Sequence, residues 1–397
     1  MSAELKQIAS RFGVYIHIPF CRRKCDYCDF YSIPFTGAPA LTSLFDDFFS
    51  ALERELFLRG ESFASFGGVA TIYFGGGTPS LVPAKNILRL IEKIDARLGV
   101  ESECEITLEA NPESVPDEKG LKLLLRNGVN RLSIGCQSFN EGSLEFLGRI
   151  HNGGEALEAV KRARGAGFSN TSLDFIFGVP GQSESELSEN LEKATLLGVP
   201  HISLYELTAE KGTPLYDKVN SGETQMPDAD LVSNMYLFIE EKVGELGFKR
   251  YEVSNYARQG FESRHNLGYW FLNPYLGLGA SAYSMRLLDN LLVRSRSPAD
   301  IKEYFRGVES ALPPNEEFIE GEALYNEFLV AELRTAYGLE IDRCVKLSGI
   351  NPLDVKGEEI QELQELGLAR VLTTENRLVC SQKGLNLLNS VIERLLL

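Results

Sequence analysis

Hydrophobic and polar positions in the first half of the chain alternate between two kinds of segment. Short runs rich in β-branched and aromatic residues are separated by longer stretches with helical periodicity, which is typical of βαβ units around a parallel sheet. The short runs predict six strands, at 14–19, 69–74, 103–109, 131–135, 171–177 and 201–206. The longer stretches predict helices around 41–59, 84–98, 117–127, 154–166 and 184–197. The pattern therefore predicts an α/β fold built from about six βα units.

The pattern changes after residue 227. A further helix is predicted over 227–246, and the aromatic segment 251–284, dotted with Gly, Asn and Pro, predicts loop and short strands. A composition change at 312–315 predicts a linker that divides the chain into domains 1–311 and 312–397. The second domain is expected to hold helices at about 317–336 and 356–366, a hairpin turning at 374–376, and a last helix from about 382.

That order of helix, hairpin and helix resembles a winged-helix module, which would suggest DNA. The acidic character of the region instead favours a packing or lid role. The whole chain carries a formal charge of −16, which argues against nucleic acid as a partner, since such binding relies on Lys and Arg. No run of about 18 apolar residues and no secretory signal is recognised, so a cytoplasmic protein is expected.

Three of the seven cysteines lie within eight residues, directly after the first predicted strand. Cys21, Cys25 and Cys28 have the spacing C-x3-C-x2-C, and three thiolates this close can face one metal centre. Three ligands for the four irons of a 4Fe-4S cluster would leave one iron open. Cys104, Cys136, Cys344 and Cys380 stand alone and are expected to be buried without chemistry.

A structural zinc site is the rival interpretation of the three cysteines. Zinc would need a fourth protein ligand, and His17, four residues before Cys21, is the obvious candidate. His17 also has a simpler explanation. Residues alternate between the two faces of a strand, so His17 would line the barrel interior together with Tyr15.

Polar residues follow the other predicted strands at the ends where a βα barrel gathers its ligand groups. A glycine run with Gly76, Gly77 and Thr78 follows the second strand, and Glu109 ends the third. Gln137 follows the fourth strand, and Asp174 lies in the fifth. The glycine run is also compatible with a tight turn, and the two acids with helix caps or surface positions. Strand-borne carboxylates at a barrel mouth more often bind or catalyse, which favours a site here.

The cysteine motif after a first strand resembles the radical S-adenosylmethionine (SAM) superfamily. The segments YIHIPFCRRKCDYC, GGGTPS, LEANPES, RLSIGCQSFN, LGRIHN and LDFIFGVPGQ together resemble the family of oxygen-independent coproporphyrinogen III oxidase, and within it the HemW branch of haem chaperones. This resemblance implies an open (βα)6-type partial barrel, a 4Fe-4S cluster on the three cysteines, and SAM on its open iron. The residues implied to contact SAM are Tyr15, Tyr27, Gly76, Gly77, Thr78, Glu109, Gln137, Arg149, Asp174 and Thr208.

Three features favour the HemW branch over the oxidase. The oxidase has a further cysteine two residues after the cluster motif, whereas Asp29 and Phe30 follow Cys28 here. The oxidase also has a long N-terminal segment, and only 14 residues precede Tyr15. The sequence HNLGYW at 265–270 matches the HNxxYW haem-binding signature of HemW. One departure is Asp26, where HemW-like sequences often have proline.

The signature implies a haem site made by His265, Asn266, Tyr269 and Trp270. A histidine nitrogen is a common axial ligand of haem iron, and aromatic rings stack on porphyrin. The alternative is that His265 caps a turn while the aromatic residues fill the core.

Three functions follow from the resemblance. The first is a haem chaperone that receives haem and passes it to acceptor proteins, and the second is radical oxidative decarboxylation of coproporphyrinogen III. Methyl transfer or ring opening on a tetrapyrrole is the third. The implied partners are haem or porphyrin, haem-acceptor proteins and a flavodoxin- or ferredoxin-type electron donor. The resemblance also allows for peripheral membrane contact and a homodimer, although no basic amphipathic anchor is evident.

Overall fold

Six parallel strands form the centre of the molecule, in the order of the chain. The structure is a computed structural model that describes residues 11–35 and 41–397, so most of the short N-terminal segment discussed above lies outside it. The six strands are β1 (Phe12–Ile18), β4 (Val69–Gly76), β5 (Val100–Ala110), β6 (Arg131–Gln137), β7 (Asn170–Phe177) and β8 (His201–Glu206). Each pairs in parallel with the next, so the six predicted strands and their βα arrangement are confirmed.

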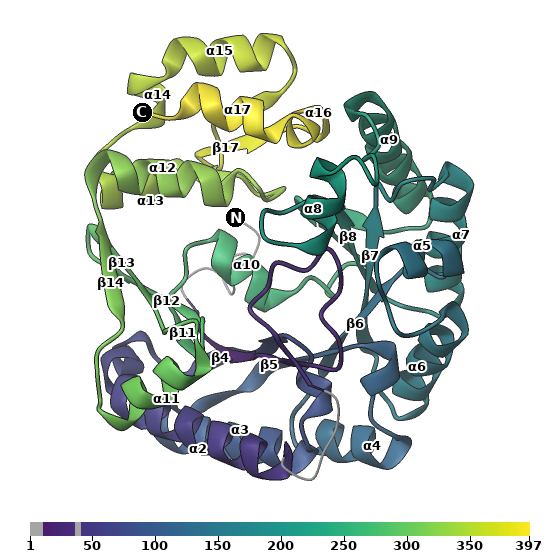
Figure 1. Ribbon diagram of the computed structural model, residues 1–397. Helices are drawn as coiled ribbons and strands as arrows, with labels where there is room; N and C mark the ends of the chain where they lie inside the picture. The colour runs from purple at the N-terminus through teal and green to yellow at the C-terminus, as the bar shows by residue number, and fades with distance from the viewer. Residues whose placement is uncertain (1–10, 36–40) are drawn as a thin grey trace.

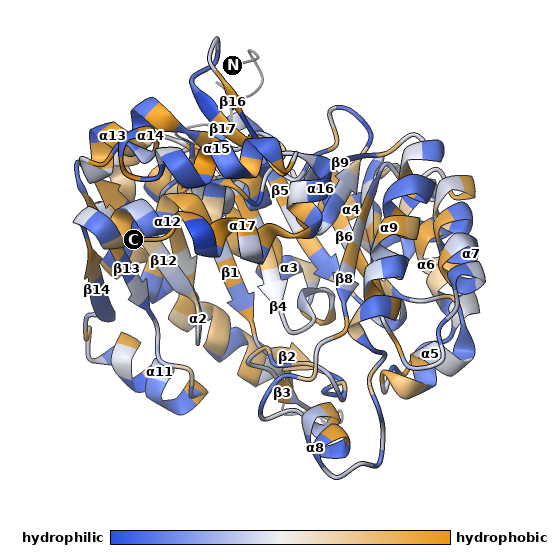
Figure 2. Cartoon of the chain, turned by 90° about the horizontal axis from the view of Figure 1, so that it is seen from above, coloured by the Kyte–Doolittle hydropathy of each residue, from blue (hydrophilic) through white to orange (hydrophobic). Residues whose placement is uncertain are grey.

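The helices that follow these strands in the chain cover the outside of the sheet (Figure 1). They are α2 (Leu41–Gly60), α3 (Ala84–Leu98), α4 (Glu118–Arg126), α5 (Glu141–Phe146), α6 (Gly153–Gly165), α7 (Glu184–Leu196) and α9 (Ala229–Glu245). Most begin at a residue whose side chain accepts the first free backbone N–H groups, such as Asp117, Asn152 and Ser183. Along α6, α7 and α9 hydrophobic and hydrophilic residues alternate, as Figure 2 shows, because one face of each helix packs on the sheet.

The sheet extends beyond the six predicted strands on both sides. In the described residues it has twelve strands, in the order β14-β13-β12-β11-β1-β4-β5-β6-β7-β8-β10-β9. The added strands are β9 (Lys249–Glu252), β10 (Asn255–Ala257), β11 (Tyr275–Leu278), β12 (Tyr283–Leu288), β13 (Leu291–Arg296) and β14 (Asn315–Ile319). Strands β14 and β9 end the order without pairing with each other, so the barrel is open, as predicted.

Two predictions for the second half of the chain were wrong in detail. The aromatic segment contains the helix α10 (Arg264–Trp270) in addition to short strands, because the Ser263 side chain accepts the backbone N–H of Asn266 and starts a turn. The helix predicted from 317 begins instead at Gly321, which has a positive φ of 59°. Residues 315–319 pair with β13 as a strand.

A second hydrophobic core lies under the C-terminal elements, which sit at one end of the molecule beyond α10 (Figure 1). Its helices are α12 (Gly321–Glu332), α13 (Ile341–Ser348), α14 (Pro352–Val355), α15 (Gly357–Glu365), α16 (Gln382–Asn386) and α17 (Leu388–Leu395). A three-stranded sheet joins them, made of β15 (Leu339–Glu340), β16 (Ala369–Leu372) and β17 (Arg377–Cys380). The predicted hairpin and final helices are therefore present. The division at residue 312 stays a prediction, since Ile319 of the main sheet packs in this second core.

Strands β2 (Phe20–Cys21) and β3 (Ile33–Pro34) pair with each other in the segment after β1, and helix α11 (Ile301–Glu309) packs on α2. Helix α8 (Pro214–Asn220) lies beside the loop between β2 and β3. No helix among the residues that the structure describes is long and apolar enough to cross a membrane.

Candidate functional site

The three cysteines of the C-x3-C-x2-C motif lie in the loop that follows β1. Cys21 is buried, while Cys25 and Cys28 are half-buried. Backbone bonds hold the start of this loop against the glycine run, because Gly77 N–H donates to Ile18 O (2.8 Å) and Thr78 N–H donates to Phe20 O (2.8 Å). A side chain at position 77 would lie within 3 Å of these carbonyl groups, so glycine is needed there.

All three thiols face one cavity of about 450 Å³ at the carboxyl ends of the parallel strands. This volume lies within the roughly 300–1,000 Å³ of small-molecule sites. Burial raises the pKa of Cys28 to about 11 and also raises the pKa of Cys21. A thiol with a raised pKa deprotonates readily only when a nearby cation, such as a metal centre, stabilises the thiolate. Thiolate is the ligand that iron–sulfur clusters require. The donor set and the cavity therefore fit a cluster with one open position.

The zinc alternative depended on His17 as a fourth ligand. Both nitrogens of its ring already have hydrogen-bond partners: Nε2 lies 2.8 Å from the carbonyl oxygen of Tyr31, and Nδ1 lies 3.1 Å from the Tyr15 hydroxyl. In the described part of the chain, no group of three or more His, Cys, Asp or Glu side chains is placed to hold a single metal ion. The geometry favours the interpretation of His17 as a barrel-lining residue.

Arg149 is a half-buried cation that donates a hydrogen bond to one of the cysteine thiols. Its Nη1 donates to Cys25 Sγ (3.3 Å), and its Nη2 donates to Asn111 Oδ1 (2.6 Å) and Gly135 O (3.0 Å). Arg22 and Arg23, between the first two cysteines in sequence, are exposed, although Arg23 also lines the rim of the cavity together with Lys24. The guanidinium group therefore sits between the cluster loop and the cavity, where it offsets the charge of thiolates.

Glu109 is the buried acid next to the glycine run. It accepts the Tyr73 hydroxyl (2.7 Å) and the backbone N–H of Gly76 (3.1 Å). Desolvation by burial, together with the nearby Asp174, raises its pKa to about 7, although the hydrogen bonds from Tyr73 and Gly76 act in the opposite direction. A carboxyl group poised near neutral pH beside a cavity can accept hydrogen bonds from a cationic ligand.

Asp174 lies on β7, across the cavity from the cysteines. Burial raises its pKa, while hydroxyl groups of Ser203, Ser133 and Ser172 donate to the carboxylate and act in the opposite direction. Gln137 ends β6 with a positive φ of 66°, a backbone strain that is often found at binding sites.

The structure brings most of the predicted SAM contacts to one place. Those that line the cavity are Tyr27, Gly76, Gly77, Glu109, Gln137, Arg149, Asp174 and Thr208. Tyr15 and Thr78 are not among the lining residues: Tyr15 points into the barrel toward His17, and Thr78 donates its hydroxyl to Cys21 Sγ (3.4 Å). The sequence reasoning missed Asn111 and Ser133, which also line the cavity. Asn111 lies just after β5 in LEANPES, a position that the strand-end rule would have included.

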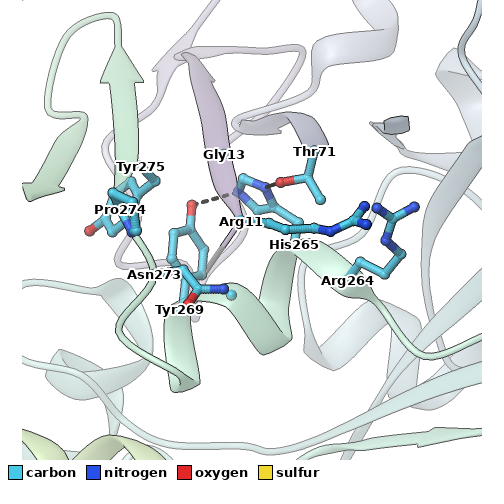
Figure 3. Close-up of a pocket in the computed structure, with 10 residues that line it drawn as sticks. Arg11, Gly13, Thr71, Arg264, His265, Tyr269, Asn273, Pro274 and Tyr275 are labelled. Atoms are coloured by element: carbon cyan, nitrogen blue, oxygen red, sulfur yellow. Dashed lines mark hydrogen bonds between the residues drawn. The ribbon is translucent and has the colours of Figure 1, made fainter. Parts of the chain in front are cut away.

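The residues of the predicted haem site lie on or beside α10, toward the opposite ends of the strands. Figure 3 shows His265 between Thr71 and Tyr269, with Gly13 of β1 behind it. Its Nδ1 lies 2.8 Å from the Thr71 hydroxyl, and its Nε2 lies 2.8 Å from the Tyr269 hydroxyl. His265 is 3% exposed, and burial lowers the pKa of its imidazole to about 3. The cavity around it measures about 20 Å³, which suits one water molecule and no porphyrin.

Trp270 does not join His265 in this arrangement. It lies beside the C-terminal part of the chain, where the guanidinium carbon of Arg334 is 5.8 Å from the centre of the indole ring. The Trp270 side chain also forms a hydrogen bond with Glu252. Asn266 uses its backbone N–H in the cap of α10. The haem site stays a prediction, and in this conformation its residues do not form one open pocket.

Asp26, the departure from the usual proline, has a structural role. Its carboxylate pairs with Lys218 of α8 (2.8 Å), and its backbone carbonyl accepts the N–H of Leu215 (2.9 Å). Leu215 packs in a small core that Tyr27 contacts. The cysteine loop is therefore fastened to α8 at this position.

Comparison with known proteins gives consistent similarities. The sequence model of the Radical SAM superfamily matches residues 15–194. The Heme chaperone HemW of Lactococcus lactis is 33% identical, over 97% of this chain and 97% of that protein. HemW of Bacillus subtilis is 38% identical, over 68% of this chain and 70% of that protein. Radical S-adenosyl methionine domain-containing protein 1 of Bos taurus is 31% identical, over 98% and 88%.

A solved structure shares the fold. Coproporphyrinogen III oxidase (HemN) from Escherichia coli, described as a radical SAM enzyme, superposes with a TM-score of 0.79. The alignment covers 100% of this chain and 93% of that one, at 21% sequence identity. The likeness confirms the open α/β barrel with its C-terminal helical part.

Proposed function

Since the chain belongs to the HemW family of radical SAM proteins, we propose that it is a haem chaperone that binds haem and delivers it to acceptor proteins. The observation that carries this proposal is similarity to HemW proteins, at 33% identity over 97% of the chain in one relative and 38% over 68% of the chain in another. The sequence Asp29-Phe30 after Cys28, in place of the oxidase's further cysteine, supports the same branch.

Cys21, Cys25 and Cys28 are proposed to hold a 4Fe-4S cluster, with SAM in the cavity beside them. When bound, the cluster and SAM would supply one-electron reduction chemistry. The chain's own residues would bind and orient SAM: Arg149 from the cysteine side, Glu109 beside the glycine run, and Asp174 from the far wall.

Haem binding by His265 is proposed to require an opening of α10. In the closed structure both ring nitrogens are engaged and the neighbouring space is too small for a porphyrin. Binding of a ligand to His265 therefore requires breaking two buried hydrogen bonds, which lowers the net binding free energy. The proposed partners remain haem, an acceptor protein and a flavodoxin- or ferredoxin-type electron donor.

Radical decarboxylation of coproporphyrinogen III is the alternative function, because the oxidase HemN shares the fold over the full chain. An activity assay separates the two. Anaerobically reconstituted chain should bind haem and leave coproporphyrinogen III unchanged. Formation of protoporphyrinogen IX would contradict the chaperone proposal and show that the chain is an oxidase.

The cofactor proposal has its own test. Iron and sulfide analysis with electron paramagnetic resonance should detect a 4Fe-4S cluster whose spectrum shifts on addition of SAM. Cys25→Ser should lose the cluster, while Cys380→Ser, at a buried cysteine of the second core, should keep it. Stoichiometric zinc in oxygen-free preparations, or an iron signal that SAM leaves unchanged, would contradict the proposal.

A further inference from the structure

Three serine hydroxyls from three neighbouring strands surround the Asp174 carboxylate. Ser203 donates to Oδ1 at 2.7 Å, Ser133 reaches both oxygens at 3.0–3.1 Å, and Ser172 donates to Oδ1 at 3.2 Å. The strands are β8, β6 and β7, so their register places the hydroxyls on the barrel interior. The serine hydroxyls occupy the acceptor positions on one side of the carboxylate. Its remaining lone pairs can accept hydrogen bonds from a ligand in the cavity.

Ser172 is also the end of a second line of hydrogen bonds. Its hydroxyl lies 2.7 Å from His201 Nδ1, and His201 Nε2 lies 2.8 Å from the Tyr251 hydroxyl. The Tyr251 oxygen accepts the backbone N–H of Ser263 at 3.1 Å. His201, Ser172 and Ser263 are at most 2% exposed, so each group needs a protein partner.

The positions of the protons follow from satisfying every donor. The Tyr251 oxygen already accepts from Ser263, and among the described residues the acceptor left for its own proton is His201 Nε2. That nitrogen must then be unprotonated, so the proton of the neutral ring is on Nδ1 and points at Ser172. With its oxygen accepting from His201, Ser172 is free to donate to Asp174. The reverse arrangement would leave a buried tyrosine proton unpaired.

We infer that His201 is a positioning residue for Asp174, held as the Nδ1–H tautomer by Tyr251 and aligning Ser172 toward the carboxylate. The ligand that Asp174 would accept hydrogen bonds from is of the nucleoside class, and this assignment rests on the proposed binding of SAM in the cavity. In every hydrogen bond of this line the group nearer Ser263 is the donor and the group nearer Asp174 is the acceptor. The last group, the Ser172 hydroxyl, therefore donates to the carboxylate. Such alignment favours an ionised, fixed carboxylate in a buried position.

Nitrogen-15 NMR of the full chain, labelled at histidine and carrying an oxidised cluster, tests the tautomer directly. The chain has four histidines, and the His201 signals are identified by their loss in His201→Asn. Nδ1–H with an unprotonated Nε2 is expected. A protonated Nε2 would overturn the inference, and this result does not depend on whether SAM binds.

SAM affinity tests the consequence. His201→Asn keeps a donor near the Nδ1 position and should bind SAM within about threefold of wild type. His201→Leu no longer fixes the Ser172 hydroxyl toward Asp174, so SAM should bind about tenfold more weakly, the effect of weakening the Ser172 bond to a charged group. Tyr251→Phe should weaken binding less and mix the tautomers of His201. The matched control is Tyr325→Phe, which loses a buried hydroxyl bonded to Leu395 O in the second core.

The variants are compared at equal cluster content, so that a folding defect is recognised. Wild-type affinity in His201→Leu with a full cluster would overturn the inference. If His201→Leu does not fold, Tyr251→Phe and the tautomer measurement decide. A wild-type chain that holds its cluster and binds no SAM would overturn the proposed binding of SAM in the cavity, while the tautomer result would still decide how His201 is held.

Discussion

Replacing Tyr269 by phenylalanine should tighten haem binding if His265 is the haem ligand. The hydroxyl of Tyr269 lies 2.8 Å from His265 Nε2 and the Thr71 hydroxyl lies 2.8 Å from Nδ1, so both nitrogens are unavailable in the closed structure. Releasing two buried hydrogen bonds at roughly 0.5–1.5 kcal/mol each costs about 2 kcal/mol, which leaves the open form populated at about 1 in 30. The apparent haem affinity is reduced by that fraction.

Tyr269→Phe keeps the aromatic ring and removes one of the two bonds. The closed form then loses about 1 kcal/mol, and the apparent dissociation constant for haem should fall about fivefold. Thr71→Val removes the other bond and should act in the same direction. Haem titration by absorbance, with His265→Ala as the variant without a ligand, measures both effects. Unchanged or weaker binding in both variants would refute the idea that these hydroxyls lock His265.

Three further outcomes are expected. Arg149→Lys should keep the cluster and weaken SAM binding by about tenfold, measured by equilibrium dialysis, because an ammonium cannot bond Cys25, Asn111 and Gly135 O at once. SAM affinity should fall as the pH drops through about 7, since Glu109 is then protonated and loses its charge, and Glu109→Gln should show no such step. Lys218→Ala should speed iron loss to a chelator at low salt, and high salt should bring wild type toward the variant.

The parallel part of the fold was predictable because its signals are local and repeated. Each predicted strand from 14–19 to 201–206 overlaps the observed strand, and the helix ends differ by one or two residues. The cavity followed from the same pattern. Parallel strands place their carboxyl ends at one edge, so Glu109, Gln137 and Asp174 were expected together before any contact was known, whereas Arg149 was implied only by the family resemblance.

The second half of the chain was less predictable because its elements are short and its contacts distant. Strand β11 pairs with β1 across more than 250 residues, as in Val14 with Leu276, and no local pattern indicates this. Helix α10 has seven residues, too few to show periodicity. The burial of His265 depends on Gly13, where a side chain would collide with Thr71 and contact the imidazole. The serines around Asp174 belong to three strands, and their convergence is a property of register alone.

Helix α10 is connected to both acids of the cavity, and this implies competition between its two proposed ligands. His265 stacks on Tyr73 at 5.0 Å, and Tyr73 donates to Glu109. Ser263, which caps α10, begins the line of bonds that ends at Asp174. If haem binding draws His265 outward, Glu109 and Asp174 lose support at the same time.

Haem should therefore weaken SAM binding, and SAM should weaken haem binding by the same factor, since coupling between two ligands is reciprocal. Titrating each ligand with and without the other measures this factor, for which about fivefold or more is expected. Equal affinities in the presence and absence of the partner ligand would show that α10 binds haem without moving, or that haem binds elsewhere.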